Sequence, residues 1–256
     1  MKTSRLCLAL GLTLLASFAS LRAASDTRVY ELRTYTATPG NIDQVVARFR
    51  EHTAKLFERH GMTNVGYWLP MDSKDGAGEK LVYLLAYPNR EAAKTAWKEF
   101  GADPEWQAVR KKTEANGKIV AKADSLYLAP TDFSKPMDSG KGKGAARVFE
   151  LRTYTAPEGK LGGLDARFRD HTQALFKKHG ITNLGYFHPA DADKGAANTL
   201  VYFLAHASRE AAAASWAAFR DDPEWKRVAA ESRKDGKLTT KVESVFLTPT
   251  DFSPIK

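Results

Sequence analysis

Polar and apolar residues alternate in VYELRTYT, from Val29 to Thr36, a segment rich in β-branched and aromatic side chains. This alternation predicts a β-strand. A proline–glycine pair then predicts a turn, and Asn41 with Gln44 resembles a capping box at the start of a helix. The helix carries an apolar face, and Gly61 is expected to end it in the left-handed conformation. The residues of this face are Ile42, Val45, Phe49, His52, Leu56 and His60.

The following segments predict two more strands, a second helix and a last strand. TNVGYWL and KLVYLLAY have the composition of strands, with a glycine-containing loop over 72–78 between them. Asn89 is expected to cap the second helix, and Asp103 with Pro104 to restart it, because these residue types favour the first helical turn. Gly117 is expected to stop it before the strand KADSLYLAP. The order β-α-β-β-α-β is that of a ferredoxin-like unit.

The whole pattern occurs twice. RVYELRTYTA at Arg28 returns as RVFELRTYTA at Arg147, an offset of 119 positions. The same offset relates HGMTNVGY to HGITNLGY and pairs two copies each of DPEW and PTDFS. We therefore expect one domain over 25–134 and a second over 147–256. The Gly, Lys and Ser content of 135–146 predicts a flexible linker between them.

Each ferredoxin-like unit covers one face of its sheet with helices and leaves the other face bare. A bare apolar face favours association, and two units in one chain can cover each other. The prediction is an α+β protein in which two ferredoxin-like βαββαβ domains pack sheet to sheet as an intramolecular dimeric α/β barrel. This pseudo-dimer leaves further oligomerisation open.

The first 24 residues have the layout of a secretory signal peptide. Lys2 and Arg5 precede an apolar run from Leu6 to Leu15, and small residues follow up to Ala24. The run is shorter than the roughly 20 residues of a membrane-spanning helix, so we expect cleavage and no stable membrane anchor. The expected location is secreted or periplasmic. Cleavage also removes the only cysteine, Cys7, so the mature chain has no thiolate for a disulfide or a metal.

Charge and motifs narrow the function further. The formal net charge is +9, but the basic residues are spread along the chain without the interleaved aromatics of a nucleic-acid track. Nucleic acid is therefore not an expected partner. The sequence contains no Walker loop, GxGxxG, GxSxG or HExxH motif, so nucleotide binding, triad hydrolysis and metalloprotease chemistry have no support. No metal or cofactor is expected.

VYELRTY, the HG and NxGY segments, the AWxxF pattern and DPEW together resemble the NIPSNAP family of the dimeric α/β barrel superfamily. The resemblance spans nearly all of both copies and implies the same fold, but no settled enzymatic activity. Superfamily relatives include cofactor-free quinone-forming monooxygenases, small-ring isomerases and haem-binding chlorite dismutases, so it implies a ligand pocket by analogy. The secretory signal and the second fused copy are expected to set this chain apart from animal members, which are tied to mitochondria, vesicular transport and mitophagy.

One set of candidate residues is expected at a pocket between helices and sheet. The helical phase points His52 inward, where a neutral imidazole can act as an acid, a base or a single haem ligand. The alternative is a buried histidine that is hydrogen-bonded to a strand or to a neighbouring tyrosine. Polar tips near the helix end are expected at the pocket mouth. The set comprises His52, His171, Asn64, Asn183, Tyr67 and Tyr186. His60 and His179 are instead expected to interact with the helix dipole at its C-terminal end.

A second set lies on the first strand of each repeat, in the pattern ExRxY. Alternation places its three polar residues on one face and Leu32 on the other. If Leu32 faces the helices, the polar residues pair across the pseudo-twofold axis between the repeats, since isolated charges there are costly. The alternative is an anion or polar-ligand site lined by Arg33 and Tyr35. The set comprises Glu31, Arg33, Tyr35, Glu150, Arg152 and Tyr154.

Three functions follow as hypotheses. The first is an exported protein that binds a small molecule in a pocket between helices and sheet, with haem as a minor variant. The second is a cofactor-free monooxygenase or isomerase that uses His52 or His171 with Tyr67 or Tyr186. The third is an interaction module without pocket chemistry. Whether the protein is an enzyme stays open at this point.

Overall fold

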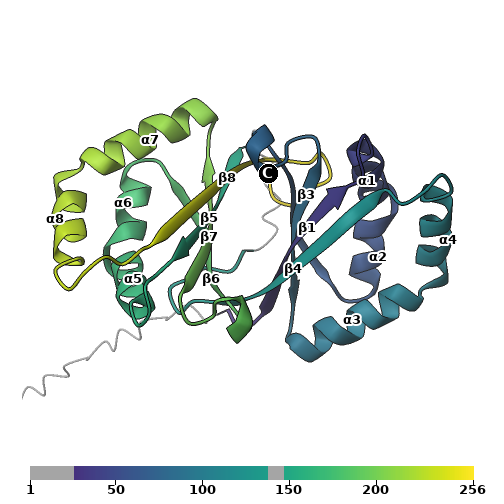
Figure 1. Ribbon diagram of the computed structural model, residues 1–256, viewed down its shortest axis with the longest axis horizontal. Coiled ribbons are helices and arrows are strands. Elements are labelled where there is room, and N and C mark those ends of the chain that lie inside the picture. Colours follow the sequence, from purple (N-terminus) through teal and green to yellow (C-terminus); the bar gives the residue numbers. More distant parts are fainter. Residues whose placement is uncertain (1–25, 138–146) are drawn as a thin grey trace, which may run out of the picture.

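The computed structural model describes residues 26–137 and 147–256 (Figure 1). The expected signal peptide and most of the expected linker lie outside these residues. Of the three described linker residues, Met137 is buried, at 2% exposure. No helix of the described ranges is long and apolar enough to cross a membrane.

Both repeats have the predicted order of elements. In each, a short π-helical segment interrupts the first helix. The first repeat contains β1 Val29–Ala37, α1 Ile42–Arg48, η1 Phe49–Thr53, α2 Ala54–Arg59, β2 Thr63–Pro70, η2 Ser73–Asp75, β3 Lys80–Tyr87, α3 Arg90–Ala102, α4 Pro104–Thr113 and β4 Val120–Pro130. The second contains β5 Val148–Thr155, α5 Leu161–Arg167, η3 Phe168–Thr172, α6 Gln173–Lys178, β6 Thr182–Pro189, η4 Ala192–Lys194, β7 Thr199–His206, α7 Arg209–Asp221, α8 Pro223–Glu231 and β8 Lys241–Pro249.

Most of the predicted helix signals are present. The Asn89 side chain accepts a hydrogen bond from the backbone N–H of Ala92 at 2.8 Å, and Asp103 caps α4 by accepting from two backbone N–H groups. Gly61 has φ +74°, as expected for its left-handed cap. The capping box at Asn41 is wrong, because the Gln44 side chain donates to the Asn41 side chain and no side chain caps the backbone there.

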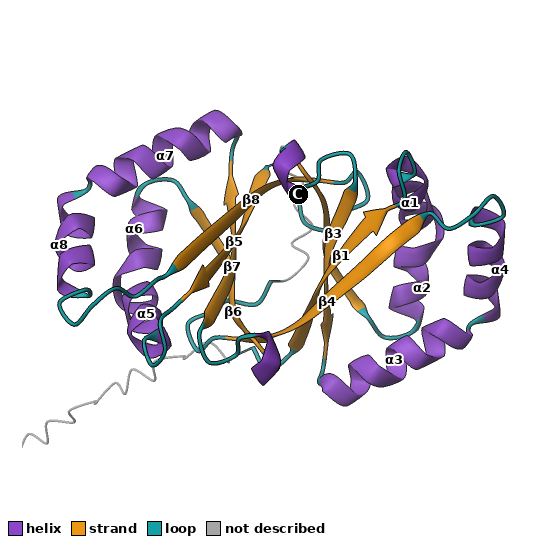
Figure 2. Ribbon diagram, viewed as in Figure 1, coloured by secondary structure: helices purple, strands orange, loops and turns teal. Residues whose placement is uncertain are grey.

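The eight strands form one closed barrel, in the order β1-β3-β2-β8-β5-β7-β6-β4. Figure 2 shows the strands in the middle of the molecule and the helices of each repeat on its outer flank. The repeats meet at both sheet edges: β2 pairs with β8 through Trp68–Pro70, and β4 pairs with β6 through Leu128–Pro130. Closure leaves no free sheet edge in this barrel, which is a general way to avoid aggregation.

The barrel is filled by apolar side chains from both repeats. Tyr30, Trp68, Phe149, Phe187 and Leu247 are all fully buried in it, with smaller residues between them. The predicted apolar contact between the two sheets is therefore present. This core shapes the backbone around it: a Cβ at Gly66 would lie only 2.3 Å from the Trp68 ring, so only glycine fits there.

The PTDFS motifs clasp the two repeats together. After β8, the backbone N–H of Thr250 donates to the Tyr67 carbonyl at 2.9 Å, and the Ser253 hydroxyl accepts from the Tyr67 N–H at 2.9 Å. After β4, the corresponding residues of the first repeat make the same two bonds to Tyr186. Each repeat thus ends on the other, which explains why this motif appears twice in the sequence.

Candidate functional site

The polar face of the ExRxY strands looks toward the helices of its own repeat, so the expected pairing across the pseudo-twofold axis is wrong. Leu32 packs against the apolar core of the barrel instead. A barrel filled by apolar side chains offers no partners to a charged group, and an unpaired charge there is costly. On the helix side, indole and hydroxyl donors are available.

In the second repeat, the Glu150 carboxylate is 1% exposed and accepts from four side chains. The Trp216 indole donates at 2.8 Å and the Ser244 hydroxyl at 2.6 Å, while His206 Nε2 lies 3.0 Å from Glu150 Oε2. Arg152 completes the set with an ion pair. These groups satisfy the carboxylate fully, so it acts as a positioning group for Arg152 and Trp216 and not as a free base.

The surroundings of Glu150 shift its pKa strongly. Burial by itself raises the pKa of this carboxyl. The contact with His206, the charge of Arg152 and the two neutral donors outweigh burial and lower the pKa to about 2. Glu150 is therefore ionised at any pH near neutrality.

The first repeat builds the same cluster with one difference. Glu31 accepts from Trp97 at 2.7 Å and from Ser125 at 2.6 Å, and it pairs with Arg33. Its fourth donor is the Tyr87 hydroxyl, at 2.8 Å, where the second repeat has His206. Both clusters hold an arginine over a tryptophan ring. The distance from the arginine Cζ to the ring centroid is 4.2 Å in the first repeat and 4.4 Å in the second.

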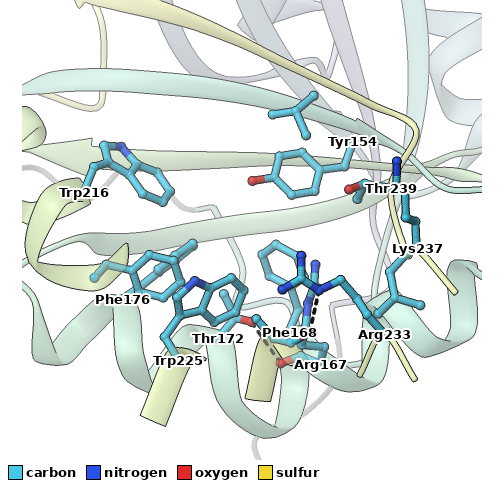
Figure 3. A pocket seen from close by; sticks show the side chains of 14 residues that line it. Tyr154, Arg167, Phe168, Thr172, Phe176, Trp216, Trp225, Arg233, Lys237 and Thr239 are labelled. Atoms are coloured by element: carbon cyan, nitrogen blue, oxygen red, sulfur yellow. Dashed lines mark hydrogen bonds between the residues drawn. The ribbon is translucent and has the colours of Figure 1, made fainter. Parts of the chain in front are cut away.

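A cavity of about 290 Å³ lies between the helices and the sheet of the second repeat. Figure 3 shows the cationic side chains of Arg167, Arg233 and Lys237 on one side and the indoles of Trp216 and Trp225 on the other. A more open hollow next to it shares four of its aromatic residues and includes Arg152. The cavity lining comprises Tyr154, Arg167, Phe168, Thr172, Phe176, Trp216, Phe219, Trp225, Ala229, Arg233, Lys237, Leu238, Thr239 and Val242.

Arg167 is the unusual residue of this lining. It is 8% exposed, and its guanidinium has one long contact, 3.5 Å to the Ser232 hydroxyl. Among the residues that the structure describes, no carboxylate oxygen lies within 4.0 Å of it, and its Nε has no hydrogen-bond partner. Burial lowers the pKa of Arg167, and the nearby charge of Arg233 lowers it further. A buried arginine without a counterion is costly unless something else supplies the negative charge.

His52 and His171 do not face this space, contrary to the prediction. The π-helical turns Phe49–Thr53 and Phe168–Thr172 each add a residue to the helix, so the inward position passes from the histidine to the next residue, a buried threonine. The Thr53 hydroxyl donates to the Arg48 carbonyl five residues earlier. The His52 side chain is 37% exposed. Both histidines line outer grooves between helices.

The other expected pocket residues tie each second strand to the preceding helix. The Tyr67 hydroxyl donates to the Asn64 side chain, whose amide donates to the Ala54 carbonyl at 2.8 Å. Asn183 and Tyr186 repeat the arrangement, and they border a small hollow of about 190 Å³. Tyr67 is fully buried, so its hydroxyl does not lie at a pocket mouth, and burial raises its pKa well above the ordinary value.

His60 and His179 lie at the ends of α2 and α6, where the sequence places them. Each ring contacts the aspartate that caps the start of α4 or α8: His60 Nε2 is 2.7 Å from Asp103 and His179 Nε2 is 2.6 Å from Asp222. The bond to His60 holds the pKa of Asp103 below its usual range, and the bonds to Lys178 and then His179 do the same for Asp222. These contacts join two helices and belong to the scaffold.

The described residues contain no cluster of three or more His, Cys, Asp or Glu side chains that could hold a metal ion. Because His52 and His171 are on outer grooves, neither is placed to ligate a haem between helices and sheet. The cavity of the second repeat instead offers cationic donors and aromatic walls. It is suited to hold an anionic molecule in place.

The fold defines a class of protein: two ferredoxin-like units in one chain, closed into the barrel that dimeric α/β barrel proteins form. The chain belongs to the NIPSNAP family, whose model matches residues 30–135 and 149–254.

Relatives and solved structures agree with this assignment. NipSnap homolog 3A of Homo sapiens is 29% identical over 252 residues, covering 94% of this chain and 91% of the relative. NipSnap homolog 3B of Mus musculus is 25% identical and covers 93% and 90%. These alignments span both repeats, so the expectation that the second copy sets this chain apart from animal members is wrong. The structure of an anthrone oxidase-like protein has a TM-score of 0.55 at 12% identity, covering 90% of this chain and 95% of its own. That of a candidate monooxygenase from Lactobacillus acidophilus has 0.53 at 14%, covering 88% and 94%. At these identities they show the fold alone.

Arg167, Arg233 and the location of the cavity in the second repeat were not predicted from the sequence. Arg167 has a counterpart, Arg48, in the first repeat, so the repeat alignment gave it no distinction. The sequence difference that could have revealed Arg167 is at the partner of Arg48: the offset of 119 aligns Glu114 with Arg233. A reversal of charge between two otherwise similar repeats marks a position where their surroundings differ.

Proposed function

We propose that this protein is an exported binding protein that holds a small molecule in the cavity between the helices and the sheet of its second repeat. The observation that carries the proposal is Arg167, a buried cation with no carboxylate partner among the described residues, in the lining of that cavity. Aromatic walls with a few convergent polar groups are typical of small-molecule sites.

Export is supported by the sequence of the first 24 residues alone. Binding is supported by the second repeat, where the Glu150 cluster orders Arg152 and Trp216 beside the cavity. The barrel between the repeats is filled by side chains and does not compete as a ligand site. No described histidine or free carboxylate lines the cavity, which favours binding over acid–base catalysis.

Native mass spectrometry of the protein purified from the cells that make it tests both parts. The denatured mass gives the N-terminus and shows whether the first 24 residues are removed. A native mass above the denatured mass reveals a retained molecule, and the expected result is one such molecule per chain. Equal masses, together with an unchanged melting temperature in a metabolite extract of the same cells, would contradict binding.

The chain offers a matched pair of variants for locating the site. Val242 is at the cavity and 49% exposed, so Val242→Trp is expected to obstruct it without disturbing the core. Ala123 is the exposed counterpart in the first repeat, and Ala123→Trp serves as the control. The retained mass is expected to disappear in the first variant and to persist in the second. Loss in both, or in neither, would place the ligand elsewhere.

A further inference from the structure

The two repeats treat the same buried arginine in opposite ways. Arg48 of the first repeat donates to the Glu114 carboxylate at 3.0 Å and contacts the Thr113 hydroxyl at 3.4 Å. The Arg48 side chain is 3% exposed and that of Glu114 is 19% exposed, so a buried cation has a half-buried carboxylate as its partner. The counterpart of Glu114 is Arg233, which gives Arg167 a second cation where Arg48 has an anion.

The charges at the cavity of the second repeat are therefore unbalanced. Arg233 Nε donates to the Ala229 carbonyl at 2.6 Å, and neither Arg233 nor Lys237 makes an ion pair with another described residue. Arg167 lies at the same cavity with its terminal nitrogens almost unused. Arg233 and Lys237 are exposed, so solvent screens their charges, whereas Arg167 is buried and is not screened in this way. An anion in the cavity would supply the counterion that Arg167 lacks, and the two exposed cations nearby would favour it.

The shape of the site selects among anions. The guanidinium of Arg167 stacks 5.4 Å from the Trp225 ring, and a planar guanidinium matches a carboxylate through two parallel bonds. Opposite the cations, Phe176, Trp216 and Phe219 form apolar walls. These walls suit an aromatic ring, since aromatic side chains bind rings through stacked or edge contacts.

Resting on the proposed function, we infer that the second repeat binds a small aromatic carboxylate, one per chain, and that Glu114 holds Arg48 so that the first repeat does not. Arg110, the counterpart of Ala229, also contacts Glu114, at 3.4 Å, and helps to hold this carboxylate beside Arg48. The cavity lining differs from its first-repeat counterparts at five aligned positions, and two of them change charge: Arg110 against Ala229 and Glu114 against Arg233. The other three exchange Ile119 for Leu238, Val120 for Thr239 and Ala123 for Val242.

Isothermal titration calorimetry of the mature chain with 2-naphthoate, 2-naphthamide and inorganic phosphate tests the inference. One naphthoate per chain is expected. The amide has the same ring without the charge, and it is expected to bind about tenfold more weakly or worse, because hydrogen bonds to a charged group are stronger than those to a neutral one. Phosphate has the charge without the ring and is expected to be weaker than naphthoate as well.

Giving each repeat the charged residues of the other tests the inference in both directions. Arg233→Glu gives Arg167 a carboxylate partner and is expected to weaken naphthoate binding at least tenfold. The double variant Arg110→Ala, Glu114→Arg frees Arg48 and is expected to raise the stoichiometry to two naphthoates per chain. Circular dichroism melting of each variant shows that it is folded before it is titrated.

Several results would overturn the inference while leaving the proposed function intact. Equal affinity for amide and naphthoate, or unchanged binding in Arg233→Glu, would show that charge does not select the ligand. Phosphate that binds as tightly as naphthoate would remove the aromatic part. Two naphthoates in the unaltered chain would remove the asymmetry. A retained molecule in native mass spectrometry without naphthoate binding would mean another ligand class, whereas the absence of both would remove the proposed function itself.

Discussion

The two repeats share a fold and differ in a few side chains at the helix–sheet layer. Both have the Glu–Arg–Trp cluster, the helix-joining aspartate and the tail that clasps the other repeat. They differ at two aligned positions of interest: Tyr87 corresponds to His206, and Glu114 corresponds to Arg233. The first repeat balances its buried charges internally, and the second leaves positive charge at a cavity. The scaffold is thus set by what the repeats share, and the site by what they do not.

This difference separates stability from binding. An ion pair such as Arg48–Glu114 satisfies a buried cation and uses up its capacity to recognise anything else. An unpaired cation such as Arg167 costs stability, because its desolvation is not offset within the protein. Binding sites commonly accept such a cost, so the second repeat is expected to be the less stable and the more functional of the two.

The largest expected effect on stability is at the Glu150 cluster. The pKa of Glu150 is about 2 in the folded protein, below the ordinary 4.5, so its contribution is complete above about pH 4.5 and is lost as the pH falls toward 2. A shift of this size corresponds to about 3 kcal/mol. Glu150→Gln is expected to lower the free energy of unfolding by about that amount at pH 7, measured by urea denaturation.

The pH dependence distinguishes this cause from simple loss of packing. The gap between the original protein and Glu150→Gln is expected to narrow steadily from pH 5 to pH 2.5. A gap that stays constant over this range would refute the assignment. His206→Tyr supplies a hydroxyl as Tyr87 does in the first repeat, and it is expected to change stability at pH 7 by less than about 1.5 kcal/mol, the worth of one such hydrogen bond.

Much of the fold follows from local sequence signals. The order of helices and strands along the chain, the caps at Asn89 and Asp103 and the left-handed Gly61 are all present as predicted, because each depends on neighbours within a few residues. The barrel follows from the repeat and from the bare sheet face. The direction of the ExRxY face does not, because both faces of β1 are covered in this fold. The choice depends on Trp97, a donor 66 residues away.

The candidate site was less predictable for two physical reasons. An assumed period of 3.6 residues puts His52 inward, but a π-helical turn shifts the phase by one residue, and Thr53 takes that place. The environment of Arg167 depends on Arg233, which follows α8 and lies 66 positions further along the chain. In the first repeat the aligned residue is Glu114, and its carboxylate neutralises Arg48.

A smaller effect is expected from removing each buried arginine in turn. Arg48→Met removes the shorter of the two ion pairs of Glu114, leaving only the 3.4 Å contact with Arg110, and it is expected to cost about 1–3 kcal/mol. Arg167→Met replaces an unpaired buried cation by an apolar side chain, a change often neutral or stabilising, and it is expected to stay within about 1 kcal/mol. Urea denaturation of both variants checks this.

Naphthoate titration of the same two variants completes the contrast. Arg167→Met is expected to lose binding at least tenfold, and Arg48→Met to keep it. If Arg167→Met were the more destabilising variant, Arg167 would have a stabilising partner within the protein. The contrast between a first repeat that pairs its buried arginine and a second repeat that leaves its arginine free to bind a ligand would then be refuted.

The smallest effect is expected at the two histidines of the π-helical turns. His52 and His171 line outer grooves, and substitutions at such positions usually change stability by about 0.5 kcal/mol or less. His52→Ala with His171→Ala is therefore expected to leave naphthoate affinity unchanged, because neither ring reaches the cavity of the second repeat. Oxygen uptake with quinol-type substrates measures the competing hypothesis of a histidine-dependent monooxygenase. Uptake by the original chain that disappears in the double variant would return catalysis to these residues, and it would do so in both repeats alike, since the π-turn geometry is common to them.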